Sequence, residues 1–350
     1  MALTILADDL TGACDSGALL AGRAAVPVTV WPAGRAAGAV SVVDTESRGL
    51  GAAEAAARVE RAVAAARGAG GAWFKKIDST LRGPVGAEIG ALLRAAGVAS
   101  ALVTPAFPAE RRVVQDGVLR VDGAAAAHVV ETLRPALDRP VACLPLAQVR
   151  AGPAALAARL RRLTGTVAVA DAETEQDLAA LVDAALAAGP AAPLLAGSAG
   201  LAGALARRLG LAGPPPALPP GGRWLVVAGS RHPATHAQVA AARRAGLEVL
   251  AAPAAPAGDP REVAAALAAE ARRALDKQDW DLVVVTGGDT AVALYQALDA
   301  ERLDLLGAPR PGLALGRLRT PARAPLVLLT KAGGFGAPDL LVALHAEPRA

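Results

Sequence analysis

Three carboxylates stand close together near the start of the chain, in the stretch "ADDLTGACDSG" at residues 7–17. Asp8 and Asp9 follow the apolar run "LTIL", and Asp15 falls early in the helix expected after the turn Thr11-Gly12. One such residue is explained by helix capping, which contributes about 1 kcal/mol. Three exceed that need, so the stretch predicts a polar site that accepts hydrogen bonds or activates a hydroxyl group.

A second polar cluster lies in "WFKKIDSTLRGPVGAEIG" at residues 73–90. Lys75 and Lys76 end an expected strand, and strand alternation puts them on opposite faces, so only one of them is expected to point into the site. Asp78, Ser79 and Arg82 follow before a helix that Gly83-Pro84 opens. A lysine and an arginine beside hydroxyl donors form a receptor for a carboxylate or a phosphate.

A third charged stretch is "TPAFPAERRVVQDGVL" at residues 104–119, where Arg111 and Arg112 follow a proline-bounded loop. This signal is weak by itself because charged loops are common, and Gln115 and Asp116 also fit a plain hairpin turn.

Glycine-rich turns follow three apolar runs in the last third of the chain. The segments are "VVAGSRHPATHAQ", "VVVTGGDTAVAL" and "VLLTKAGGFGAPDLL", at residues 226–238, 283–294 and 327–341. Glycines at a strand-to-helix turn let backbone N–H groups approach an anion, and the helix N-terminus adds its positive end. One such turn is weak evidence, but three together predict a nucleotide phosphate site.

Several common motifs are absent from the sequence. It contains no G-x-x-x-x-G-K-[ST], no G-x-G-x-x-G and no G-x-S-x-G. His232 and His236 have the spacing of a metal pair, but no Glu follows His232 and no third ligand is evident, so we expect no zinc site. A position at a helix N-terminus or beside a phosphate fits His232 better.

The elements that must position these residues are apolar, strand-like runs alternating with alanine-rich helical stretches. Nearly continuous apolar strands separated by helices predict an α/β fold with mostly parallel sheets flanked by helices. The proline-rich stretch 212–222 reads as a linker. We therefore expect domains at 1–211 and 223–350, with the active site in the cleft between them.

Bulk properties exclude several classes of protein. The formal charge of +4 is small for 350 residues, and no basic run with interleaved aromatics occurs, so nucleic acid is not an expected partner. Two cysteines fit a reducing cytoplasm, and no signal peptide is evident. The uncharged span 184–206 is broken by prolines and glycines, which favours two helices flanking a buried strand over a membrane segment.

Taken together, the motifs resemble the four-carbon acid sugar kinases, which phosphorylate threonate- and erythronate-type acids with ATP. The resemblance covers the whole chain and rests on seven segments in family order: "ADDLTGACDSG", "KKIDSTLRGPVGAE", "TPAFP", "AGSAGLA", "AGSRHPATHAQ", "TGGDTA" and "KAGGFG". It implies a sugar-acid-binding N-terminal domain, a nucleotide-binding C-terminal domain, and phosphorylation of a hydroxyl group to give a phospho-acid and ADP.

The resemblance also implies roles for particular residues. The sugar-acid site is expected to contain Asp8, Asp9, Asp15, Lys76, Asp78, Ser79 and Arg82. The ATP site is expected to contain Ser230, Gly287, Gly288, Asp289, Thr290, Lys331, Gly333 and Gly334. Asp9 or Asp78 would be the catalytic base, while Arg82 and Lys76 would hold the substrate carboxylate. Mg²⁺ would accompany ATP, and Asp289 either contacts it, directly or through water, or only caps its helix.

Two residues depart from the family pattern. Cys14 stands where the family usually has Asn, and His232 stands where a second Ser is common. Two alternatives stay open: a kinase of the same fold for another small hydroxy or keto acid, and a non-catalytic regulator that responds to a nucleotide or a sugar acid. We expect a cytoplasmic protein with a small-molecule substrate and no membrane partner, and a homodimer is compatible with this interpretation.

Overall fold

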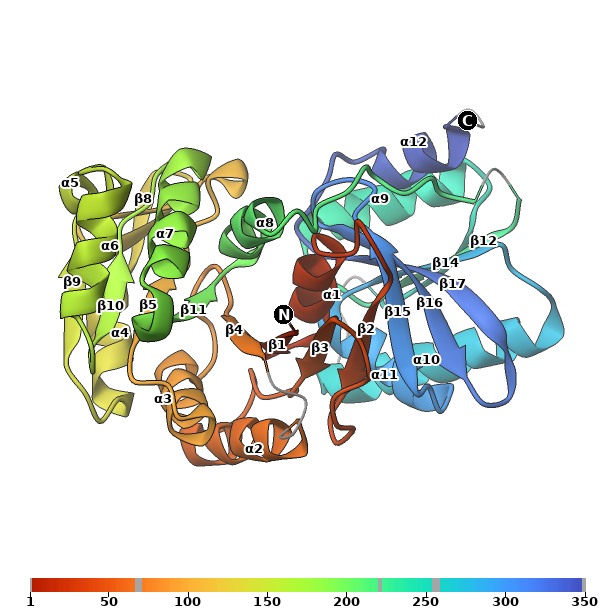
Figure 1. The fold of residues 1–350 in the computed structure, drawn as a ribbon. Coiled ribbons are helices and arrows are strands. Elements are labelled where there is room, and N and C mark those ends of the chain that lie inside the picture. The colour runs from red at the N-terminus through yellow and green to blue at the C-terminus, as the bar shows by residue number, and fades with distance from the viewer. Residues whose placement is uncertain (1, 67–70, 220–221, 254–258, 348–350) are drawn as a thin grey trace. The chain divides into compact units, whose positions relative to one another are not determined.

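The computed structural model describes residues 2–66, 71–219, 222–253 and 259–347 (Figure 1). The chain divides into two compact units, Met1–Leu20 with Val30–Ala212 and Ala21–Thr29 with Gly213–Ala350. The segment Ala21–Thr29 lies within the range expected for the first domain, yet it groups with the second unit because β2 (Val26–Val30) pairs antiparallel with β15 (Arg302–Gly307). Residues 212–219 form neither helix nor strand, and positions 220–221 of the expected linker lie outside the described residues.

The first unit is built on a parallel sheet in the order β3-β1-β4-β11-β5-β10-β9. Its strands are β1 (Leu3–Ala7), β3 (Val40–Asp44), β4 (Ala72–Lys76), β5 (Ala101–Thr104), β9 (Val141–Leu144), β10 (Val167–Ala170) and β11 (Leu194–Gly197). These strands alternate with helices along the chain, as the apolar runs in the sequence predicted. Most positions of these strands are buried, as expected for a parallel sheet covered on both faces.

Helices cover both faces of this sheet. Along one face α1, α8, α7 and α6 lie side by side, and α2 and α3 pack together on the other face (Figure 1). The helices are α1 (Leu10–Ala18), α2 (Ala52–Ala65), α3 (Val85–Ala96), α4 (Val129–Leu133), α5 (Leu146–Val149), α6 (Pro153–Arg162), α7 (Glu175–Ala187) and α8 (Ala199–Arg208), with short 3₁₀ turns η1 (Pro108–Glu110), η2 (Arg134–Ala136) and η3 (Gly189–Ala191). The uncharged span 184–206 thus contains the end of α7, the buried strand β11 and most of α8, as the sequence indicated. Among the described residues, every helix is too short or too polar to cross a membrane.

A small antiparallel sheet, which the sequence did not reveal as a whole, follows β5. It contains β6 (Arg112–Gln115), β7 (Val118–Val121) and β8 (Ala124–His128). Asp116 and Gly117 form the two-residue turn between β6 and β7, and both have positive φ, at 52° and 73°. This is the turn that matches the twist of a hairpin, so the plain turn considered for Gln115 and Asp116 is confirmed.

The second unit has a mixed sheet in the order β13-β12-β14-β17-β16-β15-β2. Its further strands are β12 (Trp224–Ala228), β13 (Glu248–Ala251), β14 (Leu282–Thr286), β16 (Leu313–Thr320) and β17 (Arg323–Lys331). Strands β13, β12, β14 and β17 run parallel to one another. The remaining strands β16, β15 and β2 extend the sheet through antiparallel pairs. Charged residues interrupt the apolar pattern of β15 and β16, which is why neither stood out in the sequence.

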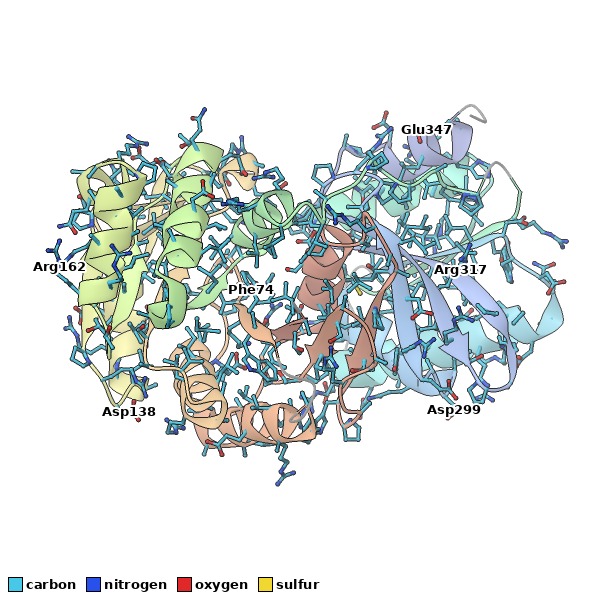
Figure 2. All side chains as sticks on the ribbon, viewed as in Figure 1. Phe74, Asp138, Arg162, Asp299, Arg317 and Glu347 are labelled. Atoms are coloured by element: carbon cyan, nitrogen blue, oxygen red, sulfur yellow. The ribbon has the colours of Figure 1, made fainter. Side chains whose placement is uncertain are left out.

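Helices also cover both faces of the second sheet. α9 (Pro233–Arg244) packs with α12 (Leu340–Ala346), and α10 (Pro260–Lys277) packs with α11 (Gly288–Ala297) (Figure 1). A buried core that includes Trp224, Val284 and Leu329 joins α9 and α12 to the sheet. Figure 2 shows that apolar and charged side chains are separated in the same way in the rest of the chain: Phe74 is buried, while Arg162 and Arg317 are exposed.

Candidate functional site

Asp8 and Asp9 follow β1 directly, at the carboxyl end of the first parallel sheet. Asp9 is the N-cap of α1, and its Oδ1 accepts a hydrogen bond of 2.9 Å from the backbone N–H of Gly12. Asp8 is 1% exposed. Helix capping therefore uses one oxygen of Asp9 and leaves the other carboxylate oxygens of this pair for another partner.

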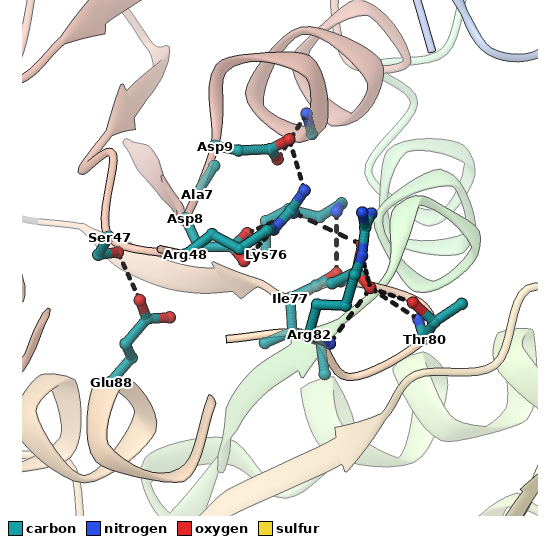
Figure 3. Close-up of polar contacts among 12 residues, drawn as sticks. Ala7, Asp8, Asp9, Ser47, Arg48, Lys76, Ile77, Thr80, Arg82 and Glu88 are labelled. Atoms are coloured by element: carbon teal, nitrogen blue, oxygen red, sulfur yellow. Dashed lines mark hydrogen bonds and ion pairs between the residues drawn. The ribbon is translucent and has the colours of Figure 1, made fainter. Parts of the chain in front are cut away.

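That partner is Arg48, which the sequence analysis did not single out. Its Nε and Nη2 donate to Asp8 at 2.8 and 3.0 Å, and its Nη1 donates to Asp9 at 2.5 Å (Figure 3). Nη2 also lies 3.7 Å from Oδ1 of Asp78. The loop after β3 carries Arg48, whose backbone N–H donates to the Asp8 carbonyl at 3.1 Å. One guanidinium thus bridges carboxylates that follow β1 and β4.

The two neighbouring carboxylates respond differently to this environment. Burial alone would raise the pKa of Asp8, but Arg48 and Lys75 outweigh it and the net pKa lies below its usual value. Burial also raises the pKa of Asp9, and there Arg48 does not compensate for burial together with the adjacent charge of Asp8. Burial by itself would lower the pKa of Arg48, but the carboxylates of Asp9 and Asp8 raise it well above normal. The guanidinium therefore keeps its charge at every physiological pH.

Lys75 and Lys76 point to opposite faces of the sheet, as strand alternation predicted. Lys75 is fully buried and its Nζ lies 2.9 Å from Oε2 of Glu88 on α3. Lys76 points to the other face, where a Cβ on Gly12 of α1 would lie 2.8 Å from its Nζ. Only Lys76 lies on the side of the acidic stretch, so it is the lysine available to a ligand there.

The pair of Lys75 and Glu88 belongs to a buried polar chain beneath the loop that carries Arg48. The Ser47 hydroxyl hydrogen-bonds Glu88 and lies 2.7 Å from the Thr45 hydroxyl, which donates to the Ala7 carbonyl at 2.8 Å. The backbone N–H of Ser47 donates to the Asp8 carbonyl at 3.0 Å. This chain ties the loop after β3 to the ends of β1 and β4.

Asp78 holds the turn after β4 together. Arg82 donates to it through Nε at 3.0 Å and Nη2 at 2.7 Å, and Thr80 donates through both its hydroxyl and, at 3.1 Å, its backbone N–H. Burial would raise the pKa of Asp78, but the hydrogen bonds from Arg82 and the charge of Arg48 lower it far below its usual value. The Arg82 side chain is 68% exposed, so its outer edge faces solvent.

The remaining predicted residues of the first unit lie beside this cluster. Ser79 is buried, and its hydroxyl oxygen accepts a hydrogen bond from Nη1 of Arg112, a residue of the third charged stretch. Asp15 is partly exposed on α1, and the charges of Lys76 and Arg112 act on its carboxylate. The structure thus brings all seven predicted acid-site residues to one edge of the first sheet. We call Asp8, Asp9, Arg48, Asp78 and Arg82 the carboxylate–arginine cluster.

In the second unit, the predicted glycine turns converge at the carboxyl ends of the adjacent parallel strands β12, β14 and β17. A Cβ on Gly229 would lie 1.9 Å from Oγ1 of Thr290, and a Cβ on Gly333 would lie 2.3 Å from Oγ of Ser230. A Cβ on Gly287, which has φ of 105°, would lie 3.0 Å from the Ser230 nitrogen. These glycines are therefore required for the close approach of the turns, which we call the glycine cradle (residues 229–232, 287–290 and 331–336).

Side chains from α9 and β17 fix the third turn of the cradle. The Lys331 ammonium donates to the carbonyls of Ala332, Gly333 and Phe335 at 2.7, 3.1 and 3.0 Å. Thr235 donates to the Gly333 carbonyl at 2.8 Å, and Gln238 donates to the Phe335 carbonyl and to the two carbonyls that follow it at 2.9–3.0 Å. Burial lowers the pKa of Lys331 to about 8. With its carbonyls held, this turn presents a fixed backbone.

Backbone N–H groups in the cradle are left for a ligand. Within the described parts of the chain, the N–H groups of Gly333 and Gly334 meet no acceptor, and α11 begins at Gly288 without a side-chain cap. Asp289 is exposed on the first turn of α11. Such unbonded N–H groups at a helix start and a glycine turn match the oxygen atoms of phosphate groups.

His232 caps a helix in this unit. His232 is the N-cap of α9, and its Nδ1 accepts a hydrogen bond of 3.2 Å from the Ala234 N–H, so the expected place at a helix N-terminus is confirmed. Throughout the described residues, no three His, Cys, Asp or Glu side chains gather in a way that could hold a metal ion.

Two family models match the chain. Residues 3–205 match the model described as a sugar-binding N-terminal domain, and residues 248–341 match a nucleotide-binding C-terminal domain. The D-threonate kinase of Bordetella bronchiseptica is 37% identical, over 97% of this chain and 95% of its own. The 3-oxo-tetronate kinase of Methylobacterium radiotolerans is 33% identical over 97% of both chains, and the D-erythronate kinase of Heliobacterium modesticaldum is 32% identical over 52% of this chain and 48% of its own.

Solved structures share the fold. A protein of Salmonella typhimurium LT2 superimposes with a TM-score of 0.81 over the whole of both chains, at 22% identity. A Bordetella bronchiseptica protein, solved as a domain-swapped dimer with bound citrate, is 31% identical with a TM-score of 0.51. The two matched domains, together with the relatives that align end to end, show that this chain belongs to the four-carbon acid sugar kinase family and is a kinase.

Proposed function

We propose that this kinase transfers the γ-phosphoryl group of ATP to a hydroxyl group of a four-carbon sugar acid, giving a phospho-acid and ADP. D-threonate is the first candidate because the relative named for it is 37% identical over 97% of the chain. The observation that carries the proposal is the set of cations held beside buried carboxylates at one sheet edge, with Arg48 bridging Asp8 and Asp9. A neutral sugar has no group that would pair with these cations. In a sugar acid, the carboxylate can pair with the cations while the hydroxyl groups donate hydrogen bonds to the carboxylates of the site.

The acid would bind through groups that the cluster leaves available. Arg82 uses Nε and Nη2 for Asp78, so its Nη1 and its exposed edge can bind the substrate carboxylate. Lys76 would add a second positive charge from β4. The carboxylates of Asp8 and Asp9 would accept hydrogen bonds from the sugar hydroxyls and so orient the reacting one. Asp78, whose pKa is strongly lowered, would position Arg82 rather than accept a proton.

The nucleotide would bind in the glycine cradle. The free N–H groups of Gly333, Gly334 and the start of α11, with the Ser230 and Thr290 hydroxyls, fit a chain of phosphates. Lys331 would hold the cradle in shape. Mg²⁺ typically retains several waters and takes one or two carboxylates besides the phosphates, so exposed Asp289 fits as its one protein ligand. When bound, the ion would neutralise the negative charge on the transferring group.

The test is ADP release with MgATP against D- and L-threonate, D- and L-erythronate and their keto forms, with threitol and erythritol as neutral controls. We expect turnover on one acid and none on the neutral polyols. Arg48→Met should lower kcat/KM for the acid by about 100-fold, because Asp8 and Asp9 would lose the guanidinium that holds their carboxylates in position, and should leave ATP binding unchanged. Arg94→Met, a surface arginine of α3 paired with Glu60, is the matched control. ATP binding without turnover on any of these acids would contradict the four-carbon assignment.

A further inference from the structure

Asp15 differs from the other carboxylates at the acid site. The Asp8, Asp9 and Asp78 carboxylates all have hydrogen-bond partners. The Asp15 carboxylate makes no hydrogen bond or ion pair with any residue that the structure describes, although its side chain is only partly exposed. On α1, Thr11 and Asp15 form the partly exposed stripe of a helix that is otherwise buried. A carboxylate left free on the accessible side of a site is available to a substrate.

The surroundings of Asp15 contain charges of both signs from four elements. Lys76 of β4 and Arg112 of β6 favour its ionised form, whereas Glu110 of η1 and Asp9, the N-cap of α1, oppose it. Burial has the largest effect, and the net result raises the pKa of Asp15 to about 6. Near neutral pH the group is therefore mostly ionised but can still take up a proton, which is the condition for an efficient general base.

We propose that Asp15 is the general base of the phosphoryl transfer, an inference that rests on the function proposed above. Its ionised carboxylate takes the proton of the reacting hydroxyl as that oxygen forms a bond to the γ-phosphorus of ATP. The bond from the γ-phosphorus to its bridging oxygen breaks, and ADP leaves with the electron pair. Asp15 then releases the proton to solvent once the phospho-acid has left.

The carboxylates expected from the sequence are less suited to this role. Asp78 is held by Arg82 and Thr80, and its pKa is far too low for a base that works near neutral pH. Asp9 uses one oxygen for the start of α1 and the other for Arg48, so a proton on Asp9 would weaken the guanidinium bridge. Asp15 can gain and lose a proton without breaking a described contact.

The first experiment is the pH dependence of the single-turnover rate with saturating MgATP and the sugar acid that supports turnover. For the wild type we expect the rate to fall below a pH of about 6, because protonated Asp15 cannot accept the hydroxyl proton. Asp15→Asn should lower the rate 10²–10⁴-fold, roughly the usual contribution of a general base. The KM values for both substrates should change little, and the acidic limb should vanish. Thermal unfolding of Asp15→Asn near pH 8 checks that the fold is intact.

Variants of the neighbouring charges test whether the acidic limb reports the titration of Asp15. A purely structural role of Asp15 would not make the limb shift with these charges. Glu110→Gln removes a negative charge that raises the pKa of Asp15, so the acidic limb should shift to lower pH. Glu131→Gln, an exposed carboxylate of α4 paired with Arg134, is the matched control and should leave the limb in place.

The outcomes separate this inference from the proposed function. Turnover by the wild type, with Asp15→Asn retaining its rate or its acidic limb, would overturn the role of Asp15 alone. An unmoved limb in Glu110→Gln would also contradict it. No turnover by the wild type on any acid would overturn the proposed function and this inference with it.

Discussion

The two candidate sites occupy the same topological position in their units, but one consists of side chains and the other of backbone groups. Each lies at the carboxyl ends of neighbouring parallel strands, where open α/β sheets place their ligands. In the first unit the site is made of charged side chains that hold one another, above all Arg48 with Asp8 and Asp9. In the second unit it is made of backbone, kept accessible by glycines that approach Ser230 and Thr290.

This difference matches the two ligands we propose. A backbone cradle recognises the repeated oxygens of a phosphate chain, which are the same in every nucleotide, so it needs shape more than chemical variety. A sugar acid is defined by the arrangement of one carboxylate and several hydroxyls, which only placed side chains can distinguish. The side-chain site therefore needs a rigid support that holds the side chains in position. The backbone site instead needs N–H groups that the phosphate oxygens can reach.

The largest predicted effect comes from breaking that support. Lys75→Met leaves the buried Glu88 carboxylate without its cation, so we expect the free energy of unfolding to fall by about 3–5 kcal/mol. Lys75→Met/Glu88→Leu removes both charges and should recover most of that loss. Urea unfolding of both variants, with Glu131→Gln as a surface control, measures the coupling.

The same variants also test whether the support serves only the first site. The affinity for MgADP of folded Lys75→Met should equal that of the wild type, because the pair supports the loop that carries Arg48 in the first unit, whereas the cradle belongs to the second unit. A double variant as unstable as Lys75→Met would refute the view that the loss arises from an unpaired buried charge.

A smaller effect is expected from filling the glycine cradle. In Gly229→Ala the new Cβ would meet the Thr290 hydroxyl at 1.9 Å, so one of the turns must move. Overpacking of this kind costs about 1–3 kcal/mol, and we expect the affinity for MgADP to fall about 10–100-fold in calorimetric titration, with sugar-acid binding unchanged. Gly51→Ala is the matched control, because its Cβ meets nothing within 4 Å and its φ of −67° suits alanine. Equal affinities of the two variants for MgADP would show that the phosphates do not use this turn.

The sequence made the second site easier to predict than the first. The glycine turns are local: each follows an apolar run and precedes a helix, so each could be recognised from a dozen residues. That they meet follows from the adjacency of parallel strands, and β12, β14 and β17 are indeed neighbours. Lys331 stood out in the sequence, but its three bonds to carbonyls of its own turn depend on how that turn folds back.

The first site depended on contacts between distant residues. Arg48 is one of many arginines, and its role follows from a pairing with residues 39 and 40 positions away. The only local signal was its place in "DTESRGL", just after an apolar run, which is where the other polar stretches also lie. The apolar parallel strands could be predicted because burial on both faces gives continuous runs. The strands β15 and β16 could not, because charges interrupt their pattern.

The smallest predicted effect concerns the one side-chain cap in the glycine cradle. His232 caps α9 through Nδ1, so His232→Ala should cost about 1 kcal/mol of stability, the typical value of an N-cap. His232→Asn should restore it because Asn can accept the same bond. His236→Ala on the same helix is the control, since the ring of His236 makes no hydrogen bond or ion pair with the described residues that the change would remove.

The MgADP affinity of these variants then sharpens the contrast between the sites. A Cβ on Gly334 would lie 3.2 Å from Nε2 of His232, so the ring borders the turn whose N–H groups are free. If the cradle works through its backbone alone, His232→Ala should bind MgADP within about fivefold of the wild type, the equivalent of the lost cap. A much larger loss that His232→Asn does not repair would mean that the imidazole itself contacts the nucleotide. In that case the second site would also depend on a placed side chain.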